Sequence, residues 1–457
     1  MTEEAAFTGI LALLHVVGDS FHETDTLQLS WLVAGYSLTV GTFILFSGRL
    51  GDVFGYKRMV MVGFSWFSLW SVLVGVSVYT ELRLAIFFRV MQGIGPALCL
   101  PNALAILGSV YPPGHRKAMV FAFFGAVAPL GAVCGGIFSS LLALAWWPWA
   151  MWALGIWLAI CALASAFLVP DMPRAATSRT TWKAWSDALD LPGTVLGTAS
   201  LVLFNFAWIQ APIDGWGTVV VIIPLILGLA LFFAFAFVEF RLSPTPILPF
   251  AAVNADVAFV LVVVACGWAT FGIWTLYLFQ LMEDVRGLSP LLSTAWLSPA
   301  AVAGGCAAVL TGNLLGRWQI QPPIVMTLAL LAFSIGIILT ATALPDQIYW
   351  GQMFFSMIIM PFGMDMSFPA ATLILSNAVP REHQGVGASL VNTVVNYGIA
   401  LGVGFAGTVE VHVRESDKTI AYRLQGYKAA LYMGIGLSGL GLGICLAFIW
   451  RTSFHTR

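Results

Sequence analysis

Two ionisable residues, Arg89 and Asp365, lie deep inside long apolar stretches of the sequence. A charged side chain at the centre of a bilayer costs about 2.5–3.5 kcal/mol on insertion scales, so it normally faces a cavity or a partner. Arginine stays protonated, so Arg89 is expected to bias a nearby acid or water instead of carrying the proton itself. Asp365 can load and release a proton as water access alternates, because burial disfavours a charged carboxylate. We therefore expect proton coupling at these two residues.

Each of the two residues also has a purely structural interpretation. Arg89 lies six residues after Arg83, which is about 9 Å along a helix, so its side chain would extend to the membrane surface. Asp365 would be an acid neutralised by a neighbouring helix. Asp214 and Asp256 lie at the boundaries of apolar runs and are weaker candidates.

The elements that must position these residues are membrane-spanning helices. Of the 457 residues, 60% are hydrophobic and 9% are charged, and the mean hydropathy is +0.92. The apolar runs repeatedly reach the roughly 20 residues that a helix needs to cross a bilayer. Because backbone polar groups in lipid must be satisfied internally, runs of this length favour helices over barrel strands. We expect an all-α integral membrane protein without a nucleic-acid partner, since the net charge is −1.

Fourteen spans are predicted, the first of them shortened. The first apolar run, 5–17, is too short to span comfortably and is followed by acidic residues. A shortened gene model explains this best, and a partial or tilted helix is the alternative. The remaining spans are 30–48, 59–78, 84–110, 118–144, 150–169, 193–211, 218–238, 257–280, 292–315, 323–344, 349–376, 385–409 and 427–450.

The spans fall into two bundles with a pair of helices between them. Residues 1–169 would form an N-terminal six-helix bundle, 170–191 a cytoplasmic connector, 192–256 two linking helices and 257–457 a C-terminal six-helix bundle. With the start of the chain in the cytoplasm, 13 Lys and Arg residues lie inside and 6 outside. This bias favours that orientation, because positively charged loops tend to stay inside.

A short segment between the second and third spans is unusually charged. It contains three basic residues and one acid, together with glycines that permit a tight turn, so we expect a loop that joins two membrane helices. The residues are Gly48, Arg49, Gly51, Asp52, Gly55, Lys57 and Arg58. Their order resembles the loop between helices two and three of the major facilitator superfamily of secondary transporters. The resemblance implies a loop that latches the cytoplasmic gate when the carrier faces outward.

The fourth span carries a second resemblance to this superfamily. Arg89, Gln92, Gly93 and Gly95 form the pattern R-x-x-Q-G-x-G. It resembles the signature of span four, in which the arginine is implicated in proton transfer.

The fifth span is rich in glycine and resembles the exporter-type signature. The residues concerned are Gly125, Pro129, Gly131, Gly135 and Gly136. Gly131 and Gly135 have no side chains and lie on one helix face, which permits close contact with another helix. Pro129 bends the helix because it removes a backbone donor. This sequence departs from the signature, because Ala128 precedes Pro129 and five residues separate that proline from the glycine pair. Generic close packing is the alternative interpretation.

Five amides in central positions are weak candidates for a substrate cavity. They are Asn205, Gln280, Gln352, Asn392 and Asn396. Hydrogen bonding between helices is the alternative explanation of such residues.

We interpret the chain as resembling the fourteen-helix drug:proton antiporter branch of fungal or bacterial multidrug and metabolite efflux proteins. The resemblance implies a proton-coupled efflux pump for a hydrophobic drug, toxin or secondary metabolite. It would work as a monomer in the plasma membrane, in contact with substrate, protons and the lipid bilayer. No cofactor is expected beyond the proton gradient. The alternatives are a proton-linked uptake carrier for a small polar solute or an ammonium-like cation, and a receptor or scaffold that transports nothing. An enzyme is not expected, because the sequence contains no phosphate-binding loop, metal-ligand cluster or nucleophile elbow.

Overall fold

The computed structural model describes residues 1–111, 115–170, 181–247, 255–378, 384–413 and 420–455. Within these ranges every regular element is a helix. This is the outcome expected of long apolar runs, because a helix satisfies its own backbone polar groups inside lipid.

The first part of the chain forms one group of helices. They are α1 (Thr2–Leu11), α2 (Leu14–Ser20), α3 (Thr26–Phe54), α4 (Tyr56–Val76), the short η1 (Ser77–Tyr79), α5 (Leu82–Gln92), α6 (Ile94–Val110), α7 (His115–Ala143) and α8 (Pro148–Leu168).

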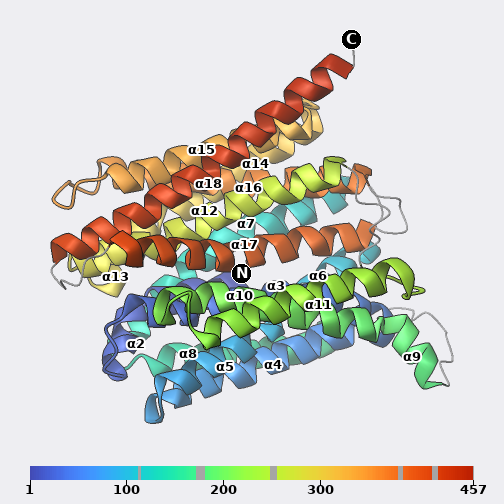
Figure 1. Cartoon of the computed structure of the whole chain (residues 1–457), viewed down its shortest axis with the longest axis horizontal. Helices are drawn as coiled ribbons and strands as arrows, with labels where there is room; N and C mark the ends of the chain where they lie inside the picture. The colour runs from blue at the N-terminus through green and yellow to red at the C-terminus, as the bar shows by residue number, and fades with distance from the viewer. Residues whose placement is uncertain (112–114, 171–180, 248–254, 379–383, 414–419, 456–457) are drawn as a thin grey trace.

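Three further helices connect this group to the rest of the chain. The short α9 (Trp182–Leu189) lies at one end of the molecule, and α10 (Leu191–Asp214) and α11 (Val219–Arg241) pack against each other beside the first group (Figure 1). Thr181 caps the start of α9 by accepting a hydrogen bond from the backbone of Ala184.

The last part of the chain forms the second group. Figure 1 draws it above most of the first group, with α7 of the first group at its level. Its helices are α12 (Ala255–Gln280), η3 (Leu281–Val285), α13 (Pro290–Leu297), α14 (Pro299–Gly312), η4 (Asn313–Arg317), α15 (Pro322–Thr342), α16 (Gln352–Ala378), α17 (Gln384–Val413) and α18 (Ile420–His455).

Twelve helices in the described ranges are long and apolar enough to cross a membrane, and α7 adds a shorter apolar stretch, Val127–Ala143. The predicted all-α membrane fold is therefore confirmed. The total of fourteen spans and the division into four segments stay predictions.

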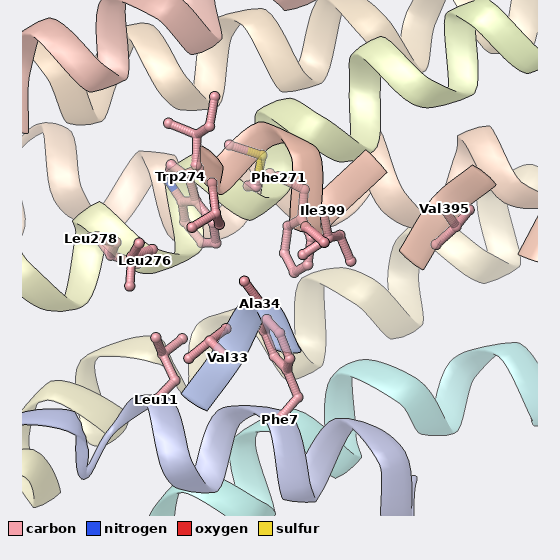
Figure 2. Packing of buried hydrophobic residues seen from close by; sticks show 14 of the residues in the cluster. Phe7, Leu11, Val33, Ala34, Phe271, Trp274, Leu276, Leu278, Val395 and Ile399 are labelled. Carbon is pink, nitrogen blue, oxygen red and sulfur yellow. The ribbon is translucent and has the colours of Figure 1, made fainter. Parts of the chain in front are cut away.

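The two groups of helices meet along a continuous apolar seam. Helix α3 packs on α17, and α7 packs on α14. Figure 2 shows part of this seam: one group contributes Phe7, Leu11, Val33 and Ala34, and the other contributes Phe271, Trp274 and Ile399.

Two predicted boundaries were wrong. The first apolar run is not one short helix from residue 5, because the chain forms two helices that break at Ala12 and Leu13, and the first of them begins at Thr2. The charged segment is not a loop of eleven residues either, because α3 continues to Phe54 and α4 starts at Tyr56. Only Gly55 separates them, with a φ of 97° that favours glycine.

Candidate functional site

Helix α1 lies between two groups of polar residues. Glu4 and Thr8 are one helical turn apart, and both line a cavity of about 70 Å³. Ala6 lies on the opposite face of the helix, and its carbonyl accepts a hydrogen bond from Nη2 of Arg89 at 2.8 Å. One face of α1 therefore borders the cavity, and the other contacts the arginine of the fourth span.

Arg89 is fully buried in the N-terminal group of helices. Its Nε donates to the carbonyl of Leu32 at 2.9 Å, and Nη1 donates to Oε1 of Gln92. The guanidinium carbon lies 4.2 Å from the centroid of the Tyr36 ring, a cation–π arrangement. Together with Ala6, these contacts join α1, α3 and α5. The side chain therefore does not extend to the membrane surface, and the structural alternative proposed for it is wrong.

Arg89 and Asp365 are not brought together. In the ranges that the structure describes, Arg89 forms no ion pair with a carboxylate, and its partners are carbonyl oxygens, Gln92 and an aromatic ring. Gln92 donates to Oγ of Ser71 at 2.6 Å, which extends the network to α4. A role of Arg89 in proton coupling stays a prediction.

Asp365 faces the same cavity as Glu4, from the C-terminal group of helices. Its Oδ2 atom is buried and has no hydrogen-bond partner among the described residues. A Cβ atom at Gly304 of α14 would lie 2.8 Å from Oδ2, so the glycine leaves room for the carboxylate. Glu4 lines this cavity from helix α1, so the two carboxyl groups share one cavity.

Aromatic rings of α12 form another wall of this cavity. Trp268, Phe271 and Trp274 all line it. The indole nitrogen of Trp274 donates to the hydroxyls of Thr340 at 2.9 Å and Ser356 at 3.0 Å, which fixes the orientation of the ring. Carboxylates next to aromatic faces form an environment that attracts cations.

The charged segment between α3 and α4 contacts the linking helices. Arg49 donates to the backbone carbonyl of Pro246, which follows α11. The carboxylates of Asp190 and Glu239 also act on the charge of Arg49, and both residues are almost fully buried. Asp52 is exposed and accepts a hydrogen bond from the hydroxyl of Tyr56.

The other residues of this segment lie in helices. Gly48 and Gly51 are within the last turns of α3, and Lys57 and Arg58 are in the first turn of α4. A Cβ atom at Gly51 would overlap the side chain of Asn102, so this glycine permits α3 and α6 to approach closely. A latch in this segment stays a prediction.

The remaining signature residues pack helices together. Gly93 separates α5 from α6 and lies against Tyr36 and Thr39, while Gly95 lies against the backbone of Phe67.

In the fifth span, Gly131 and Gly135 lie against the start of α1, and Gly136 lies against Thr8 and Thr294. Pro129 lines the cavity and packs near Gly304, whereas Gly125 is exposed with open space around it. Glycines of α7 thus bring α1 close to α7 beside the cavity.

Comparison with known proteins identifies the family. Residues 3–403 match the family model of the Major Facilitator Superfamily. The chain belongs to this superfamily. Among curated relatives, the low affinity ammonium transporter of Saccharomyces cerevisiae is 52% identical over 451 residues, covering 98% of this chain and 86% of that protein. The efflux pump terJ of Aspergillus terreus is 42% identical over 455 residues, covering 98% of this chain and 85% of that pump.

Solved structures agree with the superfamily fold. A POT family transporter in complex with a thioalcohol-conjugated peptide superposes with a TM-score of 0.72, covering 100% of this chain and 95% of that one. The two sequences are 14% identical, so the likeness concerns the fold alone. Membership makes this chain a membrane transporter and not an enzyme.

In a superfamily transporter, two halves rock around a shared central site. At the side that the charge bias places outside, Arg423 of α18 forms an ion pair with Asp284 of η3, with Nη1 and Oδ1 2.6 Å apart. The hydroxyl of Tyr427 donates to Oδ2 of Asp284 at 2.9 Å and lies 3.4 Å from the hydroxyl of Thr26 on α3. This cluster joins the two halves above the central cavity.

The five predicted amides do not line the Asp365 cavity. Asn205 and Gln280 are fully buried. Gln352 begins α16 at the outer end and donates to Thr342, so its predicted central position was wrong. Asn396 donates to the carbonyl of Asn392 at 3.3 Å and packs against Gly41, in the seam between α3 and α17.

Sequence reasoning missed Glu4, Thr8 and Asp284. The pair Glu3 and Glu4 directly precedes the first apolar run and was left outside the span. One sequence signal was available. An acid stands at the start of an apolar helix, and a small polar residue follows it one turn later.

Proposed function

We propose that this superfamily transporter is proton-coupled, and that it exports a largely apolar small molecule that carries a positive charge. The observation that carries the proposal is the cavity that Glu4 and Asp365 line from opposite halves, beside three aromatic rings. We also propose that it acts as a monomer in the plasma membrane.

The arrangement of charges supplies a mechanism for coupling. Two carboxylates in one poorly solvated cavity repel each other, and either a proton or a bound cation relieves the repulsion. A cation and a proton therefore compete for the same carboxylates. If the halves change access only when the carboxylates are neutralised, the proton gradient drives the cation in the opposite direction.

The aromatic wall favours an organic cation over a simple metal ion. A cation over the face of Trp, Tyr or Phe gains about 0.5–2 kcal/mol, and the rings also accept apolar parts of a solute. The efflux pump terJ, which is 42% identical to this chain, supports the proposed direction.

A second candidate is the uptake of ammonium. The cavity is small, at about 70 Å³, and a relative that is 52% identical is named a low affinity ammonium transporter. Ammonium would occupy the same carboxylates and rings without filling a larger space.

Transport into proteoliposomes separates the candidates. Ethidium is a suitable probe because its permanent charge prevents passive trapping in an acidic lumen. We expect an acidic lumen to drive ethidium accumulation by the wild-type chain, and we expect Asp365→Asn to abolish it. Asp256→Asn, at the exposed start of α12, serves as the matched control.

Growth of a yeast strain that lacks its own ammonium transporters tests the second candidate. Rescue of growth on ammonium without any ethidium accumulation would replace the first proposal by the second. The absence of both activities would contradict the cation site itself.

A further inference from the structure

A proline ring and a carboxylate meet over one glycine in the seam between α7 and α14. A Cβ atom at Gly304 of α14 would lie 2.4 Å from Cγ and 2.7 Å from Cβ of Pro129 on α7. The same atom would lie 2.8 Å from Oδ2 of Asp365 on α16. The ring from one half and the carboxylate from the other therefore border the same small space over this glycine.

Pro129 offers only carbon atoms to this space. It is buried near the middle of α7 and lines the cavity together with Asp365. Because proline has no backbone N–H, it cannot donate a hydrogen bond to the carboxylate. Oδ2 of Asp365 is buried and has no hydrogen-bond partner among the described residues. On the α7 side, apolar atoms instead of donors therefore lie next to the carboxylate.

The charges around the cavity do not compensate a negative charge on Asp365. Glu4 of α1 is the other charged residue in the lining, and it carries the same sign. The residues that α7, α12, α13 and α14 contribute to the lining are uncharged. A carboxylate in such surroundings is disfavoured relative to the neutral acid. The closed contact therefore favours a proton on Asp365.

Asp365 and Gly304 belong to the same half of the molecule. Helix α16 packs on α14, and Oγ1 of Thr311 on α14 donates to the backbone carbonyl of Asp365 at 3.3 Å. Pro129 belongs to the other half. When the halves rock, Pro129 therefore moves relative to Gly304, whereas Asp365 stays beside α14.

We infer that Pro129 is a positioning residue for proton coupling, because its ring keeps water from Asp365 while the seam is closed. Separation of α7 from α14 removes the ring, so that water reaches the carboxylate and the proton leaves. By linkage, a proton on Asp365 favours the closed contact, and the neutral acid is the form that passes between the two open states. The inference rests on the proposed role of Asp365 in coupling and names the residue that decides when this acid is hydrated.

A second explanation is that Pro129 acts only by bending α7. Proline lacks the N–H that would bond to the carbonyl four residues earlier, so it loosens the helix at this point. Substitutions separate the two explanations. Pro129→Ala and Pro129→Val both restore the N–H, but only valine retains carbon atoms beyond Cβ. The bend is therefore lost in both variants, whereas the apolar cover of Asp365 is lost only in Pro129→Ala.

Labelling with dicyclohexylcarbodiimide tests the inference without transport. The reagent forms stable adducts with carboxyl groups that are protonated in apolar surroundings, and mass spectrometry locates them. The full chain in proteoliposomes, at equal pH on both sides, is labelled over a series of pH values. We expect the pH of half-maximal labelling of Asp365 to fall by about one unit in Pro129→Ala, because water stabilises the charged form. In Pro129→Val most of this shift should be absent.

Two controls show whether the effect is local. Pro224→Ala removes a proline inside α11, away from the cavity, and should leave the labelling of Asp365 unchanged. Glu283 of η3 is an internal reference, because its Oε1 is also buried without a hydrogen-bond partner among the described residues and it does not line the cavity. Its labelling should be the same in all variants. Pro129→Ser is a second small substitution with the expected result of Pro129→Ala.

The results that overturn the inference are defined. One is an unchanged half-labelling pH of Asp365 in Pro129→Ala and Pro129→Ser, with Glu283 labelled as in the wild type. Another is an equal shift in Pro129→Ala and Pro129→Val, because the bend of α7 would then be the cause. Since neither a gradient nor a solute is applied, a failure of proton-driven ethidium transport would contradict the proposed function and leave this measurement unaffected.

Discussion

Glu4 and Asp365 line one small cavity from opposite halves of the molecule. Helix α1 carries Glu4 on the face opposite to Ala6, whose carbonyl binds Arg89. A change in the charge of the cavity therefore acts on the helix that also holds the arginine of span four. Helix α1 therefore links Asp365 and Arg89, the two residues predicted to couple proton movement, in the absence of a direct ion pair between them.

Replacement of Asp365 by asparagine should abolish the coupling of transport to protons while the movement of the solute across the membrane continues. The amide retains the size of the carboxylate but cannot be charged, so accumulation of ethidium against its gradient should be lost. Exchange of labelled for unlabelled ethidium at equal concentrations needs no proton and should continue. Both activities are measured in the same proteoliposomes. Normal pH-driven accumulation by Asp365→Asn would remove this residue from the mechanism.

Replacement of Arg89 should destabilise the N-terminal half. Arg89→Gln removes donors to the carbonyls of Leu32 and Ala6, and hydrogen bonds from a charged group contribute about 1.5–3 kcal/mol each. We expect the thermal midpoint in detergent to fall by several degrees, and Arg89→Lys to recover only part of the loss because it cannot reproduce the fork of donors. Replacement of Arg83, outside this network, is the control. An unchanged midpoint for Arg89→Gln would contradict the observed network.

Replacement of Gly51 by alanine should separate α3 from α6. The added Cβ atom would overlap the side chain of Asn102, so the variant should be less stable than the wild type. Asn102→Ala in the same chain removes the overlap with Asn102 but leaves Cδ1 of Tyr56 2.7 Å from the added atom, so it should restore part of the stability. The wild type and the two variants are compared by thermal unfolding in detergent. A loss that Asn102→Ala does not reduce would show that the close approach is not the cause.

Loss of the ion pair between Asp284 and Arg423 should increase the access of solvent to Thr26 from the outer side of the membrane. Asp284 holds Arg423 and Tyr427, and Tyr427 lies beside Thr26 of the other half. In a chain with Thr26→Cys, we expect Asp284→Ala to increase the rate of modification by a membrane-impermeant maleimide several-fold. Asp346→Ala, at an exposed outer position, should not change it. An equal rate in both variants would mean that this cluster does not close the outer side.

The sequence predicted the class of fold well, because runs of apolar residues long enough to cross a bilayer have few structural alternatives. It misplaced the ends of α3 and α4, since glycines at 48 and 51 suggested a turn. Both glycines lie inside α3, where Gly51 leaves room for the side chain of Asn102 from α6.

The candidate site was predicted only in part. Arg89 and Asp365 were recognisable because a charge inside an apolar run is costly. Their actual neighbours were not, because Glu4 and Asp365 are far apart in the chain. The packing of α1 on α7, of α7 on α14 and of α14 on α16 brings them to one cavity.

The release of protons when a cation binds tests the proposed coupling at the central cavity most directly. Ethidium is added to the purified chain in weakly buffered detergent solution, and the protons released are measured with a pH indicator, for the wild type and for Asp365→Asn. If Glu4 and Asp365 hold either a proton or a cation, the wild type releases protons as ethidium binds, and Asp365→Asn releases fewer or none. Saturable binding of ethidium to the wild type without any proton release would contradict the proposed coupling.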